Sequence, residues 1–412
     1  MKRILLSNYF RGGILAVFLL LSGTVCADSV RIVVTNGEQV QRQEVVEVDA
    51  AAVCQKLGAV QGESLVVRNQ FGQEVGYQLT HDGKLLIDVA VRPCGTAEFT
   101  VALGKPKAPK VYVCGRHYPE RVDDIAWEND RTAYRVYGPA LQRSGERAFG
   151  IDVWVKNTPD LVVADRYRTE LSNQRQIQAL RDAGRKAEAE ELKIETTYHF
   201  DHGYGCDGYK VGPTLGCGAP ALMDGQQLLL PYCYESYRIL DNGPLRFTVE
   251  LTYPAMVVKK DQNVVEHRII SLDKGSNFNR MTVWYEGLSK PRPLAAGVVI
   301  HTEDTGSVVL GKNYVHYADP TESPNGHNFQ IYVAALFPEG DVETKQLMEK
   351  KPANGMVGHA VGILKNYQPG QHYTYYFGSA WSKNDVRTQK QWQTCIEEFL
   401  DALSAPLSVK VL

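Results

Sequence analysis

Short runs in which apolar residues alternate with polar ones dominate this chain and predict a mainly β protein. Four such runs, rich in Val, Leu and Ile, are separated by Gly, Asn and Asp turn residues at positions 32–35, 65–68, 85–91 and 99–103. Asp82-Gly83 lies between two runs and favours a hairpin turn. We therefore expect a small antiparallel β domain over residues 28–104.

Longer and more regular runs follow a linker-like stretch at residues 105–110, where two prolines stand among lysines. They carry β-branched and aromatic residues, as half-buried antiparallel strands do, at positions 122–137, 149–155, 245–258 and 264–272. Residues 111–412 are therefore predicted to form one large antiparallel sandwich domain.

Two stretches have a helical pattern instead. Residues 168–194 are rich in Ala, Glu, Gln, Arg and Leu, which predicts an exposed helical insertion with Gly184 as a weak point or a turn. From about residue 385, one apolar stripe repeats at helical spacing, formed by Trp392, Ile396, Phe399 and Leu403. This second stretch predicts a helix that packs on the sandwich, capped by Asn384 or Asp385, with room for a last strand after it.

The first 27 residues have the pattern of a cleaved signal peptide. Lys2, Arg3 and Arg11 precede an apolar run at residues 14–21 that is shorter than the ~20 residues needed to span a bilayer. Small residues then lead to Ala27. A lipid anchor on Cys26 is the alternative, but it needs a small residue where Val25 stands. We expect a periplasmic or secreted protein with no membrane insertion after removal of the signal.

Charge and cysteine content refine this expectation. Removal of the signal region takes away three of 45 basic residues and none of 47 acidic ones, leaving a net charge of −5 and no basic surplus for nucleic acid. An exported chain permits disulfides among its seven remaining cysteines. We expect a Cys206–Cys217 bridge, which would stabilise the chain by roughly 3 kcal/mol, with buried free thiols as the alternative.

Residues 198–220 have the composition of a shaped loop rather than of a helix or strand. The segment YHFDHGYGCDGYKVGPTLGCGAP combines six glycines with His, Asp, Tyr and Lys. His202, beside Asp201, is the predicted catalytic acid or base, with Tyr209 as its partner. Lys210 and an arginine would neutralise a substrate carboxylate, as β-elimination of a uronic acid requires. The candidate arginines are Arg131, Arg135 and Arg143.

Other residues offer alternative chemistry. His199, Asp201 and His202 could ligate a divalent metal, although we expect no cofactor. Glu128 and Asp130 could form the carboxylate pair of a glycosidase if they share a strand face. His301 with Glu303 would suit a sugar epimerase. The residues predicted to line a sugar-binding cleft are Trp127, Arg131, Arg135, Tyr137, Asp201, Tyr204, His301, His359 and Trp381.

Several sequence segments resemble those of known proteins. Residues 268–285 (RIISLDKGSNFNRMTVWY) resemble the strand, tight turn and strand of galactose-mutarotase-like supersandwiches, which hold carbohydrate on a concave sheet. Residues 127–141, 198–218 and 372–383 resemble an exported domain-of-unknown-function family encoded among bacterial polysaccharide-utilisation genes. The resemblance implies a galactose-mutarotase-like sandwich and a role with glycans.

Together these patterns predict an exported, mainly β, antiparallel supersandwich with a small N-terminal β domain and a C-terminal packing helix. The predicted function is a polysaccharide lyase or glycoside hydrolase acting on acidic, uronic-acid-containing glycan fragments. A non-catalytic glycan-binding protein and an aldose epimerase are the two alternatives.

Overall fold

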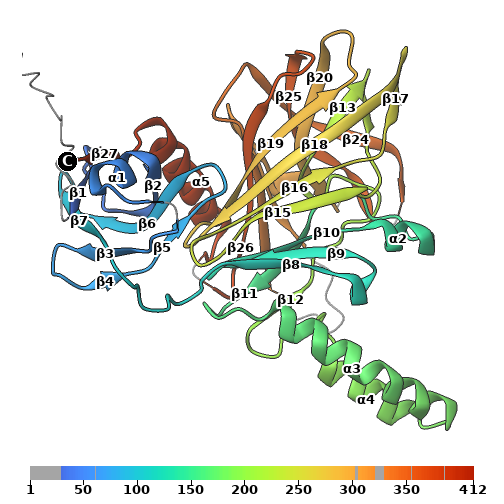
Figure 1. Ribbon diagram of the computed structural model, residues 1–412. Helices are drawn as coiled ribbons and strands as arrows, with labels where there is room; N and C mark the ends of the chain where they lie inside the picture. The colour runs from blue at the N-terminus through green and yellow to red at the C-terminus, as the bar shows by residue number, and fades with distance from the viewer. Residues whose placement is uncertain (1–28, 61, 302–304, 321–328, 354, 385) are drawn as a thin grey trace, which may run out of the picture.

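The computed structural model describes residues 29–412 except positions 61, 302–304, 321–328, 354 and 385, and within this range the chain is mainly antiparallel β (Figure 1). The predicted signal peptide therefore lies outside the described residues. No helix in the described part of the chain combines the length and apolar character that crossing a bilayer requires. Two bodies are visible: a small β domain and a larger sandwich.

The small domain packs a five-stranded sheet against a three-stranded sheet around one apolar core. A helix, α1 (Ala50–Leu57), begins after Asp49, whose carboxylate accepts the amides of Ala51 and Ala52, and ends at Gly58 in the left-handed conformation. The strands of the larger sheet, in spatial order, are β27 (Ser408–Val411), β1 (Val30–Thr35), β7 (Thr96–Leu103), β3 (Leu65–Asn69) and β4 (Glu74–Val75). The smaller sheet contains β2 (Arg42–Asp49), β6 (Lys84–Val91) and β5 (Tyr77–Leu79).

The C-terminal strand belongs to this small domain and not to the sandwich in which the sequence placed it. Strand β27 pairs antiparallel with β1, with Ile32 opposite Val411 and Thr35 opposite Ser408. Val409 and Val411 pack against the core of the small domain. The domain therefore combines both ends of the described chain.

The large domain is an antiparallel sandwich of two sheets, which confirms the predicted class. Its first sheet contains, in spatial order, β14 (Gln227–Leu229), β13 (Cys217–Asp224), β20 (Arg292–Ile300), β25 (Met356–Tyr367) and β24 (Val342–Ala353). The second contains β15 (Ser236–Asn242), β16 (Arg246–Thr252), β18 (Asp261–Asp273), β19 (Phe278–Glu286), β26 (Tyr373–Trp381), β23 (Ile331–Leu336), β22 (Tyr314–Asp319) and β21 (Val308–Leu310), with β17 (Met256–Val258) paired to β18. The short 3-10 helix η2 (Thr305–Ser307) precedes β21.

Period-two burial along the strands explains why these segments form a sandwich. From Val264 to Leu272, strand β18 buries every second side chain and leaves the alternate ones partly exposed. Its partner β19 does the same from Met281 to Tyr285. The buried sets of both sheets meet in one continuous core that contains Val298 and Tyr375.

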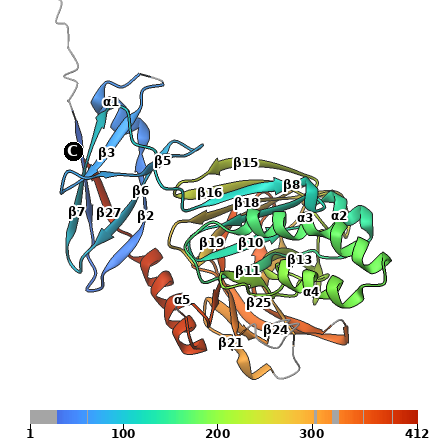
Figure 2. The same cartoon turned by 90° about the horizontal axis from the view of Figure 1, so that it is seen from below.

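A third sheet covers one end of the sandwich and carries a helical hairpin on its outer face (Figures 1 and 2). Its strands, in spatial order, are β12 (Gly205–Asp207), β11 (Asp152–Lys156), β10 (Thr132–Val136), β9 (Asp124–Glu128) and β8 (Cys114–Tyr118). The short helices η1 (Pro119–Arg121) and α2 (Pro139–Ser144) connect them, and the hairpin consists of α3 (Val163–Asp182) and α4 (Lys186–Thr196). An aromatic cluster that includes Trp154, Tyr167 and Tyr198 joins the hairpin to the sheet.

Two predicted single strands are each divided in the structure. The run at residues 122–137 turns back at Asn129, whose side-chain oxygen accepts the amides of Arg131 and Thr132 and so closes the β9–β10 hairpin. The run at 245–258 divides into β16 and β17. Asn129-Asp130 in the first run and Pro254 in the second are turn-forming residues that the strand prediction passed over.

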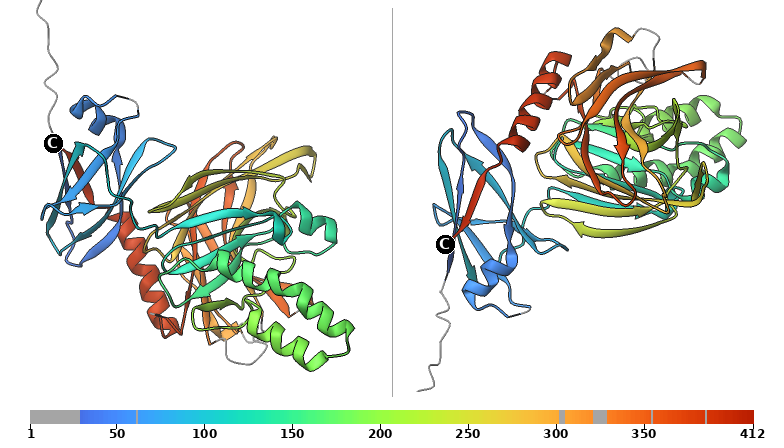
Figure 3. Two further views of the ribbon diagram at one scale, coloured as in Figure 1. Left: turned by 60° about the horizontal axis from the view of Figure 1, so that its bottom comes forward. Right: turned by 90° about the horizontal axis from the view of Figure 1, so that it is seen from above.

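The terminal helix α5 (Gln389–Ser404) starts later than predicted. Its N-cap is Thr388, which forms a capping box with Gln391, and not Asn384 or Asp385. Trp392 and Ile396 are fully buried against the sandwich. As Figure 3 shows, the helix then leads the chain back to the small domain.

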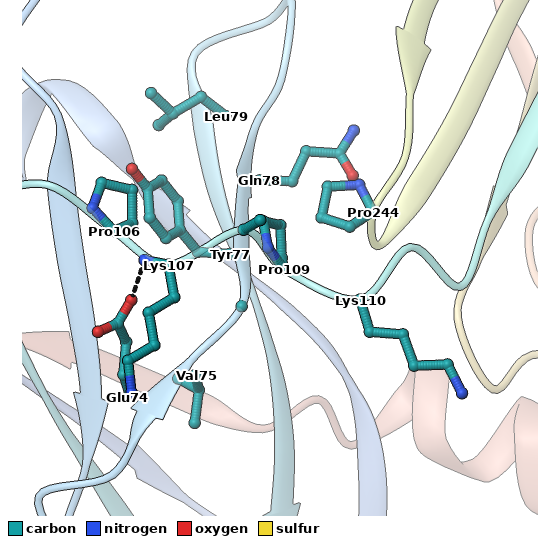
Figure 4. A pocket seen from close by; sticks show the side chains of 12 residues that line it. Glu74, Val75, Tyr77, Gln78, Leu79, Pro106, Lys107, Pro109, Lys110 and Pro244 are labelled. Carbon is teal, nitrogen blue, oxygen red and sulfur yellow. Dashed lines mark hydrogen bonds between the residues drawn. The ribbon is translucent and has the colours of Figure 1, made fainter.

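Polar contacts fix the small domain against the sandwich. Gln78 accepts the amides of Leu245 and Arg246 and donates to the Arg246 carbonyl, while Arg246 also pairs with Glu47. Beside this contact, the linker leaves a hollow of about 480 Å³ (Figure 4). Prolines and Tyr77 form much of its wall, and the Lys107 amide donates to Glu74 across it.

Candidate functional site

The glycine-rich segment is packed between the third sheet and the sandwich. It contributes β12 to the third sheet, and Gly216 forms a parallel bridge with Ile151. Gly150 lies so close to the Leu215 carbonyl group that a Cβ would overlap it. Gly218, at φ +90°, lies equally close to the ring of Phe377. The glycines therefore allow a close approach that brings the segment to the ends of the sandwich strands.

The first polar group of the site surrounds Arg135 at the end of β10. Its Nη2 donates to Asp207 at 2.9 Å and pairs with Asp152, while Nη1 lies 3.5 Å from Asp124. Burial raises the pKa of Asp152 to about 8, even though Arg135 opposes this shift. The positive charge of Arg135 is therefore engaged by neighbouring carboxylates, which makes it a support for the site and not a clamp for a substrate.

The edge of this group reaches solvent. The ring of Tyr137, which is half-buried, lies 5.0 Å from the Arg135 guanidinium carbon. His199, whose side chain is 48% exposed, places its Nδ1 3.2 Å from the Asp207 carbonyl oxygen. Asp207 thus connects the buried arginine to an exposed imidazole.

The second polar group is a histidine–aspartate pair at the ends of two sandwich strands. His301 follows β20 and Asp319 ends β22, and the His301 Nδ1 lies 2.5 Å from the Asp319 Oδ2. The His301 backbone amide donates to the Tyr317 hydroxyl at 3.3 Å. A carboxylate at Nδ1 holds the imidazole in the tautomer that leaves Nε2 as the acceptor. This pair has the arrangement of an oriented general base.

Tyr209 joins the two groups. Its ring centroid lies 5.8 Å from that of His301 at 77°, and its buried hydroxyl has no hydrogen-bond partner among the described residues. Burial raises the pKa of Tyr209 well above its usual value, and the nearby charges of Asp319 and Asp152 add to this shift. The phenol therefore stays protonated near neutral pH and can donate a proton. Lys210, which is half-buried, follows it directly in the chain.

His359 lies behind this pair. Its Nε2 accepts the Leu215 amide at 3.3 Å. Burial lowers the pKa of His359 to about 4, so this ring is neutral near pH 7. It is placed to support the glycine-rich segment and not to exchange protons with a substrate.

His202 and Asp201 lie nearer the protein surface than Tyr209, which is buried. His202 is exposed, and its Nε2 lies 3.0 Å from the Thr197 carbonyl oxygen. Asp201 accepts the amides of Gly203 and Gly205 and pairs with Lys383. Burial acts to raise the Asp201 pKa, but Lys383 and the two amides bring it below its usual value. These residues brace the outer turn of the segment.

Tyr204 belongs to the same turn. The Arg166 guanidinium carbon lies 5.1 Å from its ring, and Arg166 Nη2 donates to its carbonyl oxygen at 2.6 Å. The ring of His202 is 6.3 Å away. Tyr204 thus fixes the turn to helix α3.

The predicted sugar-stacking tryptophans are core residues. Trp127 is fully buried and donates its indole NH to Asn279 at 2.8 Å, while Trp381 is 2% exposed. Arg131, in the β9–β10 turn, is half-buried and donates to Asn277 in the turn between β18 and β19. Neither ring presents a face to solvent, because both belong to the buried core of the large domain.

The predicted carboxylate pair also separates. Glu128 is buried and pairs with Lys156 at 2.6 Å, and it accepts the amides of Val162 and Val163 where α3 begins. Asp130 lies in the turn and accepts the Gly275 amide. The pair is therefore structural, because the hairpin turn at Asn129 removes the shared strand face on which the idea of a glycosidase depended.

The predicted disulfide was wrong: the seven cysteines of the described residues are free thiols. Cys206 lies in β12 of the third sheet, whereas Cys217 begins β13 in the sandwich and donates its thiol to the Gly378 carbonyl. Burial raises the pKa of Cys206 to about 12, which keeps the thiol protonated and unreactive. Close glycine packing and Asp201 hold the segment in place of a covalent bridge.

Among the described residues, no three His, Cys, Asp or Glu side chains come together in a way that could hold a metal ion. His199 contacts Asp207, whereas Asp201 and His202 face other partners. Glu303, predicted to pair with His301, lies outside the described residues.

Sequence reasoning missed Asp319 and Asp152 as members of the site. Asp319 ends the run YVHYAD, in which nothing marks it as different from any strand-terminal aspartate. Its role depends on the pairing order of β20 and β22 within two opposed sheets, which is a property of the tertiary fold.

Comparison with known proteins identifies relatives of the whole chain. Residues 34–409 match the sequence model of a family described as Domain of unknown function (DUF4861). The uncharacterized protein P7 from Formosa agariphila is 25% identical over 311 residues, which are 73% of this chain and 70% of that protein.

One solved structure shares the fold. A protein in glycosyl hydrolase family 38 from Enterococcus faecalis aligns with 94% of this chain and 48% of its own, at 8% identity and a TM-score of 0.50. An alpha-mannosidase from Enterococcus faecalis V583 aligns with 94% and 46%, at 10% identity and a TM-score of 0.47. This chain thus spans about half the length of these proteins, and the likeness concerns the sandwich fold alone.

Proposed function

The chain belongs to the DUF4861 family, and from this premise we propose that it is a carbohydrate-active enzyme that cleaves acidic glycans by β-elimination. One observation carries the proposal. A protonated, buried phenol without a hydrogen-bond partner among the described residues, Tyr209, lies beside His301, whose Nδ1 is held by Asp319. This is an acid and a base side by side.

Each member has a role in the elimination of a uronic-acid unit. Nε2 of His301 removes the proton on the ring carbon next to the carboxylate, and the electron pair of that C–H bond becomes a carbon–carbon double bond. The bond to the glycosidic oxygen on the neighbouring carbon breaks, and the Tyr209 hydroxyl protonates the departing oxygen. A proton from the imidazolium, passed through water, restores the phenol.

The charges around the pair favour this division of roles. A tyrosine with a raised pKa keeps its proton near neutral pH, so Tyr209 can pass that proton to the strongly basic oxygen of the departing sugar. An imidazole whose Nδ1 is held by a carboxylate presents its Nε2 as the base. Lys210 directly follows Tyr209 in the chain, and we infer that its positive charge offsets the substrate carboxylate as negative charge moves onto it. Export through the predicted signal peptide would bring the enzyme to extracellular polysaccharide.

The test is an assay of the purified chain against pectic, glucuronan, arabinogalactan and algal oligosaccharides. Ultraviolet absorbance detects the unsaturated product of a lyase, and new reducing ends without absorbance detect hydrolysis. We expect absorbance on at least one acidic substrate. Tyr209→Phe and His301→Gln should each lower kcat by about 100-fold or more, because each removes one proton-transfer group.

A matched control is His372→Gln, which changes an exposed histidine stacked on Trp284 away from the site. It should keep full activity. Reducing ends without absorbance, or full activity in both Tyr209→Phe and His301→Gln, would contradict the proposed chemistry. Binding of an oligosaccharide without cleavage would support a glycan-binding protein instead.

A further inference from the structure

A second hollow lies at the end of the third sheet, outside the group of residues assigned to catalysis. Its volume is about 350 Å³, within the size range of ligand pockets at about 300–1,000 Å³. It lies where the β8–β9 turn meets helix α2 and the start of β15. Its wall includes His117, Asp123, Pro139, Tyr234, Glu235 and Tyr237.

Aromatic rings form one wall of this hollow. Tyr237 is 37% exposed, and its ring centroid lies 4.9 Å from that of His117. Tyr234 packs against Tyr237 with ring centroids 5.8 Å apart and nearly perpendicular planes. A tyrosine ring that is supported from the side and open to solvent offers an apolar surface to the C–H face of a sugar.

Polar groups that bind hydroxyls lie beside the aromatic rings. The Asp123 carboxylate is 20% exposed and lies 3.4 Å from the His117 Nε2. Its Oδ2 accepts the Ala140 amide, which leaves Oδ1 directed toward His117 and the hollow. A carboxylate and an imidazole side by side can accept from and donate to neighbouring hydroxyls of one sugar ring.

The backbone that carries Asp123 adopts a conformation that L-residues rarely use. Val122 and Asp123 have φ values of +46° and +63°, which is unusual for a β-branched residue such as Val122. The Tyr234 hydroxyl holds the Asp123 carbonyl at 2.6 Å, and the Leu141 amide holds that of Val122. Strain of this kind persists only where the surrounding structure maintains it, and it fixes the direction of the Asp123 side chain.

The hollow adjoins the catalytic group through the chain itself. Asp123 precedes Asp124 of the Arg135 network, and Tyr137, at the edge of that network, is two residues before Pro139. Two residues span at most about 7 Å. A glycan that ran from Tyr209 and His301 along the Arg135 group would pass Tyr137 before it reached the hollow.

We propose that this hollow binds a neutral pyranose unit of the glycan, stacked on Tyr237 and hydrogen-bonded to Asp123 and His117, as a subsite away from the cleavage point. The charges select against a uronic acid here, because Asp123 and Glu235 are acidic and Arg143, 72% exposed, already pairs with Asp123. The position as a subsite rests on the proposed function, whereas sugar binding in the hollow does not.

The binding test uses saturation-transfer NMR with the methyl glycosides of glucose, galactose, xylose and rhamnose as probes. We expect transfer to at least one of them in the wild-type chain and in His301→Gln, because the hollow does not include His301. Tyr237→Ser and Asp123→Asn should each weaken binding about tenfold or more. Asn tolerates the left-handed backbone, so Asp123→Asn should keep the fold.

Phe71→Ser is the control, since it removes a ring from the small domain that is more exposed than Tyr237, at 76% against 37%. It should leave binding unchanged. Absence of saturation transfer to all four probes, or equal binding in Tyr237→Ser and the wild type, would overturn the inference.

A second measurement separates this inference from the proposed function. With oligosaccharides of increasing length, Tyr237→Ser should raise KM about tenfold for the long substrates and leave kcat and KM for the shortest one unchanged. If no substrate is cleaved but the methyl glycosides bind in a Tyr237-dependent way, the proposed function fails and the sugar site stands. If cleavage occurs with no effect of Tyr237→Ser at any length, the subsite fails and the enzyme stands.

Discussion

His316 should make the stability of the chain depend on pH through helix α5. It lies in β22, three residues before Asp319, and is fully buried beneath the helix. Neither ring nitrogen has a hydrogen-bond partner among the described residues. Burial lowers the pKa of His316 to about 4, although Glu397 on α5 partly opposes this shift. The folded chain thus holds this imidazole neutral where the unfolded chain would protonate it.

The sign and size of the effect follow from the two pKa values. The unfolded chain takes up a proton near pH 6.5 and the folded chain only near pH 4, so stability falls as the pH drops through this window. A shift of this size corresponds to about 3 kcal/mol in total. Between pH 7 and pH 5, roughly 2 kcal/mol of this amount should be lost.

Replacing His316 with leucine isolates this contribution from those of all other titrating groups. His316→Leu removes two buried polar atoms without a bonding partner, so we expect it to be at least as stable as the wild type at pH 7. Urea unfolding of both chains, followed by tryptophan fluorescence at pH 7 and pH 5, gives the free energies of unfolding. The stability advantage of the variant should grow by about 2 kcal/mol at pH 5.

His372→Leu serves as the control, because it makes the same replacement at an exposed histidine. If His316→Leu and the wild type lose the same free energy between pH 7 and pH 5, the reasoning is refuted. That result would mean that the His316 imidazole is protonated inside the fold or that α5 opens locally.

Three further predictions concern the scaffold and the site. Lys156→Met should destabilise the chain by about 3–5 kcal/mol in urea unfolding, because it leaves the Glu128 carboxylate buried without its cation. Adding Glu128→Gln to this variant should restore most of the lost stability. If the two substitutions destabilise the chain additively, the pairing of Lys156 with Glu128 is contradicted. Gly150→Ala should cost about 3 kcal/mol or more, because its Cβ would overlap the Leu215 carbonyl group, and an unchanged melting temperature would show that the segment can move aside. His202→Ala should keep full glycan-cleaving activity, since this ring is exposed and hydrogen-bonded to the Thr197 carbonyl oxygen. A loss of activity comparable to that of His301→Gln would instead support His202 as the catalytic acid or base, as the sequence predicted.

Periodicity carried the fold prediction further than the site prediction. Buried side chains alternate with more exposed ones along β18 and β19. The residue types of such strands were enough to predict an antiparallel sandwich. The end of the chain could not be assigned in this way. Strand β27 is a short alternating run that fits an edge of either domain, and only its pairing with β1 decides between them.

The site was predictable only where one segment supplies its parts. The glycine-rich composition indicated Tyr209 correctly as a member of a packed loop, but His202, from the same loop, faces outward. The partner of Tyr209 is His301, which is 92 positions away in the sequence. No local pattern encodes that distance, because it depends on how the third sheet is placed over the sandwich.

The pairing of β27 with β1 also constrains the order of events during synthesis. Strand β1 leaves the ribosome among the first of the described residues, yet one of its edges stays without a neighbour until residues 408–411 have emerged. The small domain would therefore wait, with an open strand edge, for almost the entire polypeptide to be made. Chaperones that bind exposed strands could bind this edge of β1 during the interval. In a polypeptide that ends before residue 408, the edge would stay without its β27 partner.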